Sequence, residues 1–512
     1  MRDGAAVPQQ NEVLIGLHVG TASIEAVAFA PDGHELAPAV VALPCREPGA
    51  GVVEQEVGET WRATVLALRR LAQAVPHLQA RTVALAITGA SHGTWLIDED
   101  GDPVGPAWLA QDRRAEPVVA RWRQSGVAAR VQEISGRRLE PSLRSAQLAW
   151  LAQHQPGMLD GAVTAFAAKD CLYFFCTGER ATDAATAVAA FGDWRTGAYD
   201  SRVLELLGLA QVSKLLPEIV DGTRHHGALT AAAAAASGLL ASTPVVLAPV
   251  NTVTTALALG LGRRDPALGG TVLGASNLHM RVCADLALAA TMAGQAAVLP
   301  FAPAGGWLGV LEQSGTINIE WLITAAEQLL RDAGLIGLPS HELSALLERR
   351  AAEAAPGAVS YRPYAGEGGA AFCGLSSRTT FYDLLRAIYE GLGDAARDGY
   401  AALGFRPCQV RVNAGAGAGP LAYACLAGCL DTPVFTTGRE TPAAAGAALV
   451  AAVALGHYRD VIDGQREWVE PRLREVEKVA RKRVGSVSRD RAATASGRLS
   501  RAGGRSAGNC CP

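Results

Sequence analysis

Three short glycine turns in the chain carry the residue types that hold phosphate groups. Each turn follows an apolar run, and the candidate nucleotide contacts are Gly20 and Thr21 in "GLHVGTAS", Gly274 and Ser276 in "GGTVLGAS", and Gly415 and Gly417 in "VNAGAGAGP". Glycine lets backbone N–H groups approach phosphate oxygens closely, and hydroxyl side chains add donors. A single turn of this kind also fits a structural role, with a capping threonine or close strand-helix packing. Their repetition favours a nucleotide cleft.

The elements around these turns alternate between strands and helices. Residues 13–17 and 24–29 have the pattern of strands around the first turn, and "PDGHEL" supplies the next turn of a β-meander. Apolar residues at helical spacing over 59–75 precede a buried strand at 82–88. A comparable layout recurs after about residue 250. We therefore predict two α/β domains that face each other across the cleft.

The domain boundaries follow from this layout and from a change in composition. We predict an N-terminal domain over 11–250, a C-terminal domain over 251–463, and a disordered basic tail over 471–512 that is rich in Arg, Ser, Gly and Ala. Such a tail is either a solvated extension or a contact for nucleic acid or acidic lipid. The alanine run at 231–236 is predicted to be helical.

Composition narrows the class of partner. The 512 residues carry a formal net charge of −3, which provides no basic face for nucleic acid or a membrane surface, so small ligands are expected instead. The 10 cysteines are scattered without zinc-type spacing, and Cys425 and Cys429 are predicted to be small core residues. The first residues lack the apolar core of a signal peptide, and no apolar run is long enough for a membrane span. A cytoplasmic protein is expected, and a homodimer is left open.

The order of the segments resembles the FGGY carbohydrate kinases, which have two ribonuclease H-like domains of the actin/Hsp70 ATPase type. The resemblance covers residues 13–456. Its motifs are "GLHVGTAS", "VEQEVGETW", "ITGASHGTWLIDEDGDPVGPAW", "AQDRRA", "AAKDCLYFFCTGERATDAATA", "TPVVLAPVNTVTTALALGLG", "GGTVLGAS", "VNAGAGAGPLAYACLAGCLDTPV" and "ETPAAAGAALVAAVALGHY".

Within that family, four segments look most like the erythritol kinase branch: "VTTALALGLG", "LGASNLHMRV", "RPYAGEGGAAFCGLSSR" and "REWVEP". The resemblance implies transfer of the γ-phosphoryl group of ATP to a terminal hydroxyl of a short polyol or sugar, with Mg²⁺ bridging the phosphates.

The chain departs from the family pattern at the two positions closest to the chemistry. His18 stands where the family has an aspartate associated with the metal, and Asn251 stands where it has the aspartate that accepts the proton of the acceptor hydroxyl. An imidazole nitrogen is a poor ligand for Mg²⁺, although His18 could donate a hydrogen bond to a phosphate oxygen. An amide is no base near neutral pH, and loss of a general base typically removes about 10²- to 10⁴-fold in rate.

Three further family positions are altered. Alanine replaces the glutamine of the Q-M-H-G segment at Ala90, the tryptophan of W-x-D-x-R at Ala110 and the threonine of the second phosphate loop at Ala275, where Ser276 is a substitute. The loop "YAGEGGAAF" is shortened. These changes, with the loss of both carboxylates, are typical of a pseudokinase.

The acceptor site is expected among the polar and aromatic residues of the sugar-facing segments. The candidates are His92, Trp95, Asp112 and Arg114, of which His92 and Asp112 could also replace the missing base. Each of the four also fits a structural role as a buried hydrogen-bonded or paired side chain. Asp183 is predicted to begin a helix or fix a turn instead.

Two hypotheses remain. The first is a carbohydrate kinase specific for an erythritol-like polyol, which is slow or depends on another base. The second is a catalytically inactive protein that binds nucleotide or polyol and acts through closure of the cleft. A different ATPase on the same fold is disfavoured by the sugar-facing segments.

Overall fold

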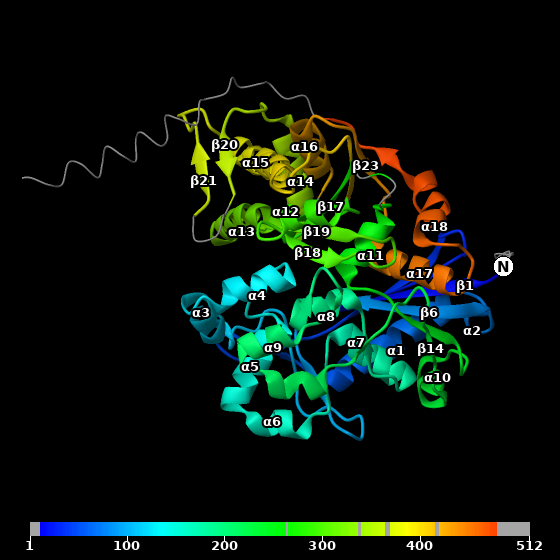
Figure 1. The fold of residues 1–512 in the computed structure, drawn as a ribbon. Helices are drawn as coiled ribbons and strands as arrows, with labels where there is room; N and C mark the ends of the chain where they lie inside the picture. The colour runs from blue at the N-terminus through cyan, green and yellow to red at the C-terminus, as the bar shows by residue number, and fades with distance from the viewer. Residues whose placement is uncertain are drawn as a thin grey trace, which may run out of the picture.

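The computed structural model describes residues 11–262, 265, 267–335, 339–363, 369–414 and 419–478. It contains two large sheets, one in each half of the molecule (Figure 1). The six-stranded sheet has the order β14-β15-β6-β1-β2-β3, and the seven-stranded sheet has the order β18-β19-β17-β16-β22-β23-β24. The predicted mixed α/β organisation is confirmed.

The strands of the N-terminal sheet form around the apolar runs seen in the sequence. They are β1 (Val13–Val19), β2 (Ser23–Phe29), β3 (Glu35–Ala42), β6 (Thr82–Gly89), β14 (Gly227–Ala228) and β15 (Pro244–Leu247). β1, β2 and β3 form the predicted antiparallel meander, whereas β6 and β15 run parallel to β1. Helices α1 (Val57–Ala74) and α7 (Ala168–Thr177) pack against this sheet, and the predicted alanine helix α10 (Ala231–Ser237) packs against these two helices.

A helical region extends the N-terminal half beyond the sheet. Its helices are α3 (Glu116–Gln124), α4 (Val127–Ser135), α5 (Arg144–His154), α6 (Pro156–Gly161), α8 (Ala184–Phe191) and α9 (Ser201–Leu207). Short strands link it to the rest, including β5 (Val52–Gln55), β7 (Trp95–Ile97), β8 (Ala107–Trp108) and β9 (Thr164–Phe166).

The C-terminal sheet has a similar arrangement. Its strands are β16 (Leu268–Leu273), β17 (Ser276–Cys283), β18 (Ala297–Pro300), β19 (Trp307–Ser314), β22 (Gln409–Ala414), β23 (Val434–Thr436) and β24 (Arg474–Glu475). Its helices include α12 (Leu286–Met292), α13 (Ile317–Asp332), α14 (Ser340–Glu353), α15 (Phe381–Ala402) and α16 (Pro420–Leu430). Cys425 and Cys429 are buried in α16, as predicted.

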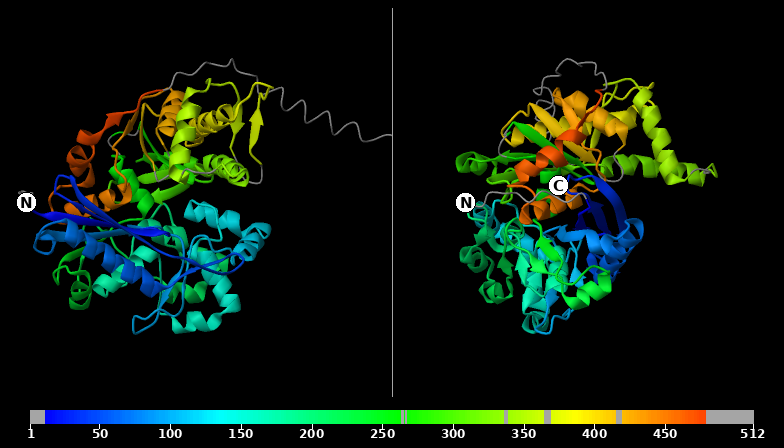
Figure 2. Two further views of the ribbon diagram at one scale, coloured as in Figure 1. Left: turned by 180° about the vertical axis from the view of Figure 1, so that it is seen from behind. Right: turned by 90° about the vertical axis from the view of Figure 1, so that its right-hand side faces the viewer.

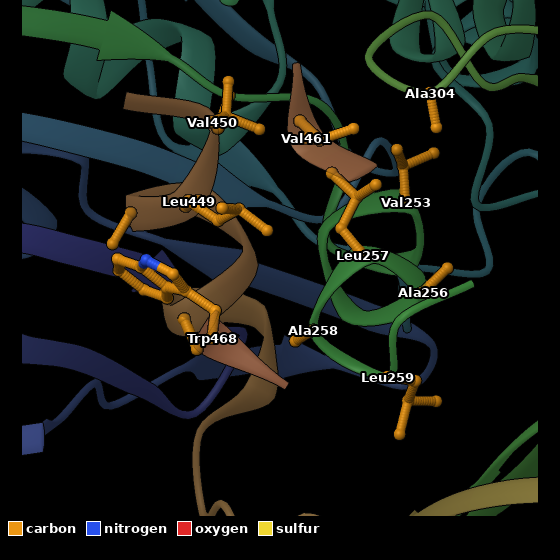
Figure 3. Close-up of a cluster of buried hydrophobic side chains, with 14 of the residues drawn as sticks. Val253, Ala256, Leu257, Ala258, Leu259, Ala304, Leu449, Val450, Val461 and Trp468 are labelled. Atoms are coloured by element: carbon orange, nitrogen blue, oxygen red, sulfur yellow. The ribbon is translucent and has the colours of Figure 1, made fainter. Parts of the chain in front are cut away.

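Two helices join the halves at the centre of the molecule. α11 (Asn251–Ala258) packs against α17 (Pro442–Ala454), and α17 also covers β1 and β6 of the N-terminal sheet. The apolar cluster at this junction includes Leu257 and Leu449 (Figure 3). The backbones are so close that a Cβ atom added at Gly446 would overlap the carbonyl of Thr254, and one at Gly16 would overlap that of Ala444. Alanine and glycine therefore permit this approach.

The C-terminal segment is tied to the β2–β3 turn. Trp468, at the end of α18 (Val461–Trp468), packs against Phe29 with tilted rings whose centres are 5.4 Å apart, and it donates its indole N–H to the Pro31 carbonyl at 2.9 Å. Arg439 donates to the Gly33 carbonyl at 2.8 Å. The two further views show this segment beside the blue N-terminal strands (Figure 2).

The predicted tail begins too early. Residues 471–478 are ordered, because β24 pairs antiparallel with β23 and closes the edge of the C-terminal sheet. The backbone hydrogen bonds of this edge outweigh the polar composition that suggested disorder. Residues 479–512 lie outside the described residues.

Candidate nucleotide and acceptor site

Three segments of the N-terminal half meet at one edge of its sheet. The register pairs His18 with Thr88, and Ile87 with Leu247, so β1, β6 and β15 end side by side. Because these strands are parallel, the chain that follows each of them emerges at the same edge. The first glycine turn, residues 90–93 and the start of α11 therefore converge, and this edge is the candidate site.

The first turn is a three-residue connection, residues 20–22, between β1 and β2. The Gly20 N–H donates to the Ser23 carbonyl at 2.9 Å, and an added Cβ at Gly20 would lie 2.9 Å from the same oxygen. A side chain at position 20 would therefore crowd the Ser23 carbonyl, and the turn requires glycine there. Thr21 is partly exposed beside it.

His18 stands just before this turn and contacts two polar side chains. Its Nδ1 lies 3.2 Å from Glu25 Oε2 on the neighbouring strand β2, and its Nε2 lies 3.3 Å from the Asn251 Nδ2. A carboxylate only accepts hydrogen bonds, so Nδ1 carries the proton and donates to Glu25, while Nε2 accepts from the Asn251 amide. The imidazole is 16% exposed and can be reached from solvent.

Glu25 is oriented from both sides. Its second oxygen, Oε1, accepts from the Ser23 hydroxyl at 3.2 Å. Burial alone would raise the pKa of this carboxyl, but the hydrogen bond from His18, together with that from the Ser23 hydroxyl, lowers the pKa below its ordinary value. Glu25 is thus held as a carboxylate against the imidazole.

Asn251 is the first residue of α11 and is fixed by the turn before it. The Thr88 hydroxyl donates to the Pro249 carbonyl at 2.6 Å and lies 3.2 Å from the Thr254 hydroxyl, which itself bonds the Asn251 carbonyl at 3.1 Å. These contacts tie the start of α11 to β6. The amide of Asn251 is thereby held beside His18.

The second glycine loop lies in the C-terminal half between β16 and β17. The Gly274 N–H donates to the Asn277 side chain at 3.3 Å, and its carbonyl accepts from Thr316 N–H at 2.7 Å. Ser276 is exposed at the start of β17. β16 and β22 are parallel and end together at Leu273 and Ala414. Gly415 and Gly417 follow β22 and lie outside the described residues, as does most of the shortened loop.

His92, a candidate residue of the acceptor site, contacts one arginine and experiences the positive charge of a second. Its Nε2 accepts from Arg137 Nη2 at 3.1 Å. Burial, and then the positive charges of Arg137 and Arg144, lower the pKa of His92 to about 3. The imidazole is neutral near pH 7, but its acceptor nitrogen is engaged by the guanidinium.

The other three acceptor candidates are held within the protein. Trp95 is 1% exposed within β7. Asp112 accepts from the Val53 N–H at 2.9 Å and from Arg114 Nη2 at 2.7 Å, and Arg114 also pairs with Glu54 at 2.7 Å. The Arg114 guanidinium lies 3.3 Å from the centre of the Trp108 ring. Asp112 and Arg114 are thus brought together, but as a mutual ion pair.

Asp183 begins α8, as the sequence predicts. Its Oδ1 accepts from the Ala185 N–H at 2.9 Å, and its Oδ2 pairs with the fully buried Lys169 at 2.8 Å. Lys169 also pairs with Asp170 at 2.5 Å. Burial opposes ionisation of Asp183, but Lys169 and the helix-start hydrogen bonds lower its pKa overall.

Sequence reasoning missed Glu25, Arg137 and Arg144. Glu25 was detectable, because a hairpin that pairs Val19 with Ile24 must place residue 25 opposite His18. The two arginines lie in a helical region with no periodic signal for their direction. Arg144 is 1% exposed, and its three guanidinium nitrogens have no hydrogen-bond partner among the described residues.

The side chains at the first turn do not fit a protein-held Mg²⁺ ion. Mg²⁺ prefers carboxylate and water oxygens, whereas His18 offers a nitrogen, Asn251 an amide, and Glu25 is engaged by His18 and Ser23. Across the part of the chain that the structure describes, no group of three or more His, Cys, Asp or Glu side chains is placed to hold a metal.

No described helix is long and apolar enough to cross a membrane.

Relatives with similar sequences are sugar and polyol kinases. An erythritol kinase from Brucella abortus (strain 2308) is 37% identical over 492 residues, which cover 92% of each chain. A glycerol kinase from Acidovorax sp. (strain JS42) is 29% identical over 499 residues, covering 89% of this chain and 93% of the relative.

Solved structures share the fold. A xylulose kinase from Rhodospirillum rubrum has a TM-score of 0.78 at 23% identity, covering 95% of this chain and 98% of the other. A Plasmodium falciparum glycerol kinase with ADP has a TM-score of 0.75 at 14% identity, covering 96% and 97%. The actin/Hsp70-like two-domain fold is therefore confirmed.

The family match spans both halves of the chain. The N-terminal domain of the FGGY family of carbohydrate kinases matches residues 13–258, and the C-terminal domain of the same family matches residues 269–455. Together with the 37% identical relative, these matches show that the chain belongs to the FGGY family of carbohydrate kinases.

Proposed function

We propose that this FGGY-family chain transfers the γ-phosphoryl group of ATP to a terminal hydroxyl of a short, erythritol-like polyol in the cytoplasm. The observation that carries the proposal is the identity of 37% with an erythritol kinase along 92% of both chains. The convergence of the first glycine turn, residues 90–93 and Asn251 at one sheet edge supports it, because phosphoryl transfer depends mainly on positioning of donor and acceptor.

In this proposal, each half contributes part of the site. Gly20, Thr21, Gly274 and Ser276 face the ATP phosphates, and Gly415 and Gly417 back the nucleoside. The acceptor side is shaped by His92, Trp95, Asp112 and Arg114, and Arg137 is added to this group because it contacts His92. His18 and Asn251 stand between the two.

Mg²⁺ remains a prediction taken from the family resemblance. The first turn has no ligand set that fits it, so we assign no protein ligand to the ion and derive no step through it. A homodimer also remains a prediction.

The alternative function is an inactive protein that binds nucleotide or polyol and acts by closing its cleft. The observation that favours it is the direct contact of His18 and Asn251, which occupy two carboxylate positions of the family pattern. ATP binding and polyol binding occur under both functions. Turnover separates them.

The test is ATP turnover with Mg²⁺ against erythritol, glycerol, xylitol, xylulose and ribulose, read as ADP release and as phosphorylated product by mass spectrometry. Product from erythritol, or from one closely related polyol, supports the kinase. Tight binding of ATP and polyol without product for any acceptor supports the inactive alternative.

A further inference from the structure

We propose that His18 is the proton acceptor of the phosphoryl transfer and that Glu25 positions it. This inference rests on the proposed kinase function. His18 replaces the family's metal-associated aspartate. In this proposal it accepts the proton of the acceptor hydroxyl, which the Asn251 amide cannot do.

The geometry of the pair is that of an oriented base. Glu25 accepts the proton of Nδ1 at 3.2 Å, which fixes the tautomer and leaves the lone pair on Nε2. Nε2 points away from Glu25 toward the Asn251 amide at 3.3 Å. The nucleophile and base arrangements of many enzymes use the same logic, in which a carboxylate orients a histidine whose far nitrogen takes the proton.

The position of the pair suits the reaction. His18 is the second-last residue of β1 and precedes the glycine turn, and its Nε2 lies against the first residue of α11. An acceptor hydroxyl that binds between the turn and Asn251 can replace the amide as the hydrogen-bond partner of Nε2. The side chain exposure of 16% leaves the ring accessible for this exchange.

The surroundings add little charge besides Glu25. Helix α17, which packs on β1, consists of alanine, glycine, valine, leucine and proline and carries no charge. The neighbour of His18 on β6 is the uncharged Thr88. Lys169 of α7, which also packs against β1, is paired with Asp170 and Asp183. Glu25 is therefore the carboxylate that stabilises the imidazolium when the proton arrives.

The other candidate bases are engaged elsewhere. Nε2 of His92 accepts from Arg137, and the carboxylate of Asp112 is bound by Arg114 and the Val53 N–H. Among the described residues, neither side chain forms a hydrogen bond to the first turn or to Asn251. His18 is the titratable side chain that meets the start of α11.

The proposed reaction moves one proton and one phosphoryl group. The O–H bond of the acceptor breaks and its proton passes to His18 Nε2, while the acceptor oxygen forms a bond to the γ-phosphorus of ATP. The bond from that phosphorus to the bridging oxygen breaks, and its electron pair leaves with ADP. The imidazolium, held by Glu25, then returns the proton to solvent.

The experiment is a kcat profile over pH 5 to 9 for the full chain with ATP and the best polyol of the panel. His18→Asn should lower kcat by roughly 10²- to 10⁴-fold and remove the fall of kcat on the acid side. His18→Gln serves as the second substitution. His34→Asn, at an exposed turn on the same meander, is the matched control and should leave the profile unchanged.

The positioning role of Glu25 is tested by a change in the pH profile, which a merely structural role would not produce. Glu25→Gln should shift the acid fall of kcat to lower pH, because loss of the carboxylate favours the neutral imidazole, and Glu25→Asp should restore the original profile in part. Thermal unfolding and ADP binding of each variant show that fold and nucleotide site survive.

Two failures are distinguishable. An active wild type whose His18 variants keep both the rate within about threefold and the acid fall overturns the role of His18 and leaves the kinase intact. A wild type that binds ADP but phosphorylates no polyol overturns the kinase function and the base assignment together.

Discussion

The Nδ2 of Asn251 lies 3.3 Å from the Nε2 of His18, although 233 positions separate the two residues in the chain. Residues in contact do not act independently, so substitutions at these two positions should be coupled. The two positions that depart from the family pattern therefore belong to one site.

That coupling is measurable in a double-mutant cycle. Asn251→Asp places a carboxylate where the acceptor hydroxyl is expected, so it provides a second base and should retain or raise kcat. In that background His18→Asn should cost less than in the wild type, by about 1 kcal/mol or more of coupling. Equal costs of His18→Asn in both backgrounds would contradict it. The measurement is kcat of the four proteins at one pH.

Gly446 should tolerate no side chain. Gly446→Ala places a Cβ atom into the backbone carbonyl of Thr254, so α17 and α11 must separate, and we expect a loss of about 1–3 kcal/mol in the free energy of unfolding. Urea denaturation measures the loss. Gly157→Ala is the matched control, since its added Cβ meets no atom within 4 Å, and it should be neutral or stabilising.

Trp468 should anchor the C-terminal segment. Trp468→Ala removes a ring that is 1% exposed, together with the hydrogen bond to Pro31, and should lower the free energy of unfolding by about 3–5 kcal/mol. Trp321→Ala, whose ring is 48% exposed, is the control and should cost far less. A loss of unfolding free energy for Trp468→Ala no larger than that for Trp321→Ala would contradict the anchoring role.

His92 should make stability depend on pH. Its pKa in the folded protein is about 3, below the ordinary value of 6.5, so the unfolded chain binds the extra proton between these pH values. Stability is therefore lost as pH falls below 6.5, by about 1 kcal/mol for the first full pH unit.

The comparison that isolates His92 is His92→Gln against wild type, by urea denaturation at pH 7.0 and pH 5.5. The variant should lose less stability over this interval, because glutamine does not titrate. Parallel losses would show that His92 gains its proton without penalty. Other buried groups, such as His279, contribute equally to both proteins and cancel.

Arg137 should act on acceptor binding more than on the chemical step. It donates to His92 at 3.1 Å and its Nε has no hydrogen-bond partner among the described residues, so this N–H is left to donate to a bound polyol. Arg137→Met should raise the KM for the polyol by roughly 10- to 100-fold, with kcat within about threefold, because a lost hydrogen bond to a charged group is worth about 1.5–3 kcal/mol. An unchanged KM would place Arg137 outside the acceptor site.

Much of the fold was predictable because apolar periodicity records which face of an element is buried. The meander of β1, β2 and β3, the alanine helix α10 and the start of α8 at Asp183 all follow from local signals. β24 was not predictable, because two polar residues form a strand only when the edge of β23 is present. Its stability comes from a partner distant in the sequence.

The juxtaposition of the candidate residues at one sheet edge was predictable, but their side-chain contacts were not. Strand order places His18, residues 90–93 and Asn251 together, and hairpin counting would have added Glu25. The mutual pairing of Asp112 with Arg114 and the arginine neighbours of His92 depend on side-chain directions in irregular segments. No sequence spacing specifies those directions.

The packing of α17 on β1 and β6 has a consequence for biosynthesis. The N-terminal sheet is complete once the ribosome has passed residue 247, yet the helix that covers one of its faces is encoded at Pro442–Ala454. At roughly 5–20 residues per second, the nascent chain carries that apolar face uncovered for about 10–40 s. During this interval, a chaperone or a second nascent chain can occupy the place of α17, so yield in the cell should depend on translation speed through the part of the message that encodes residues 248–454.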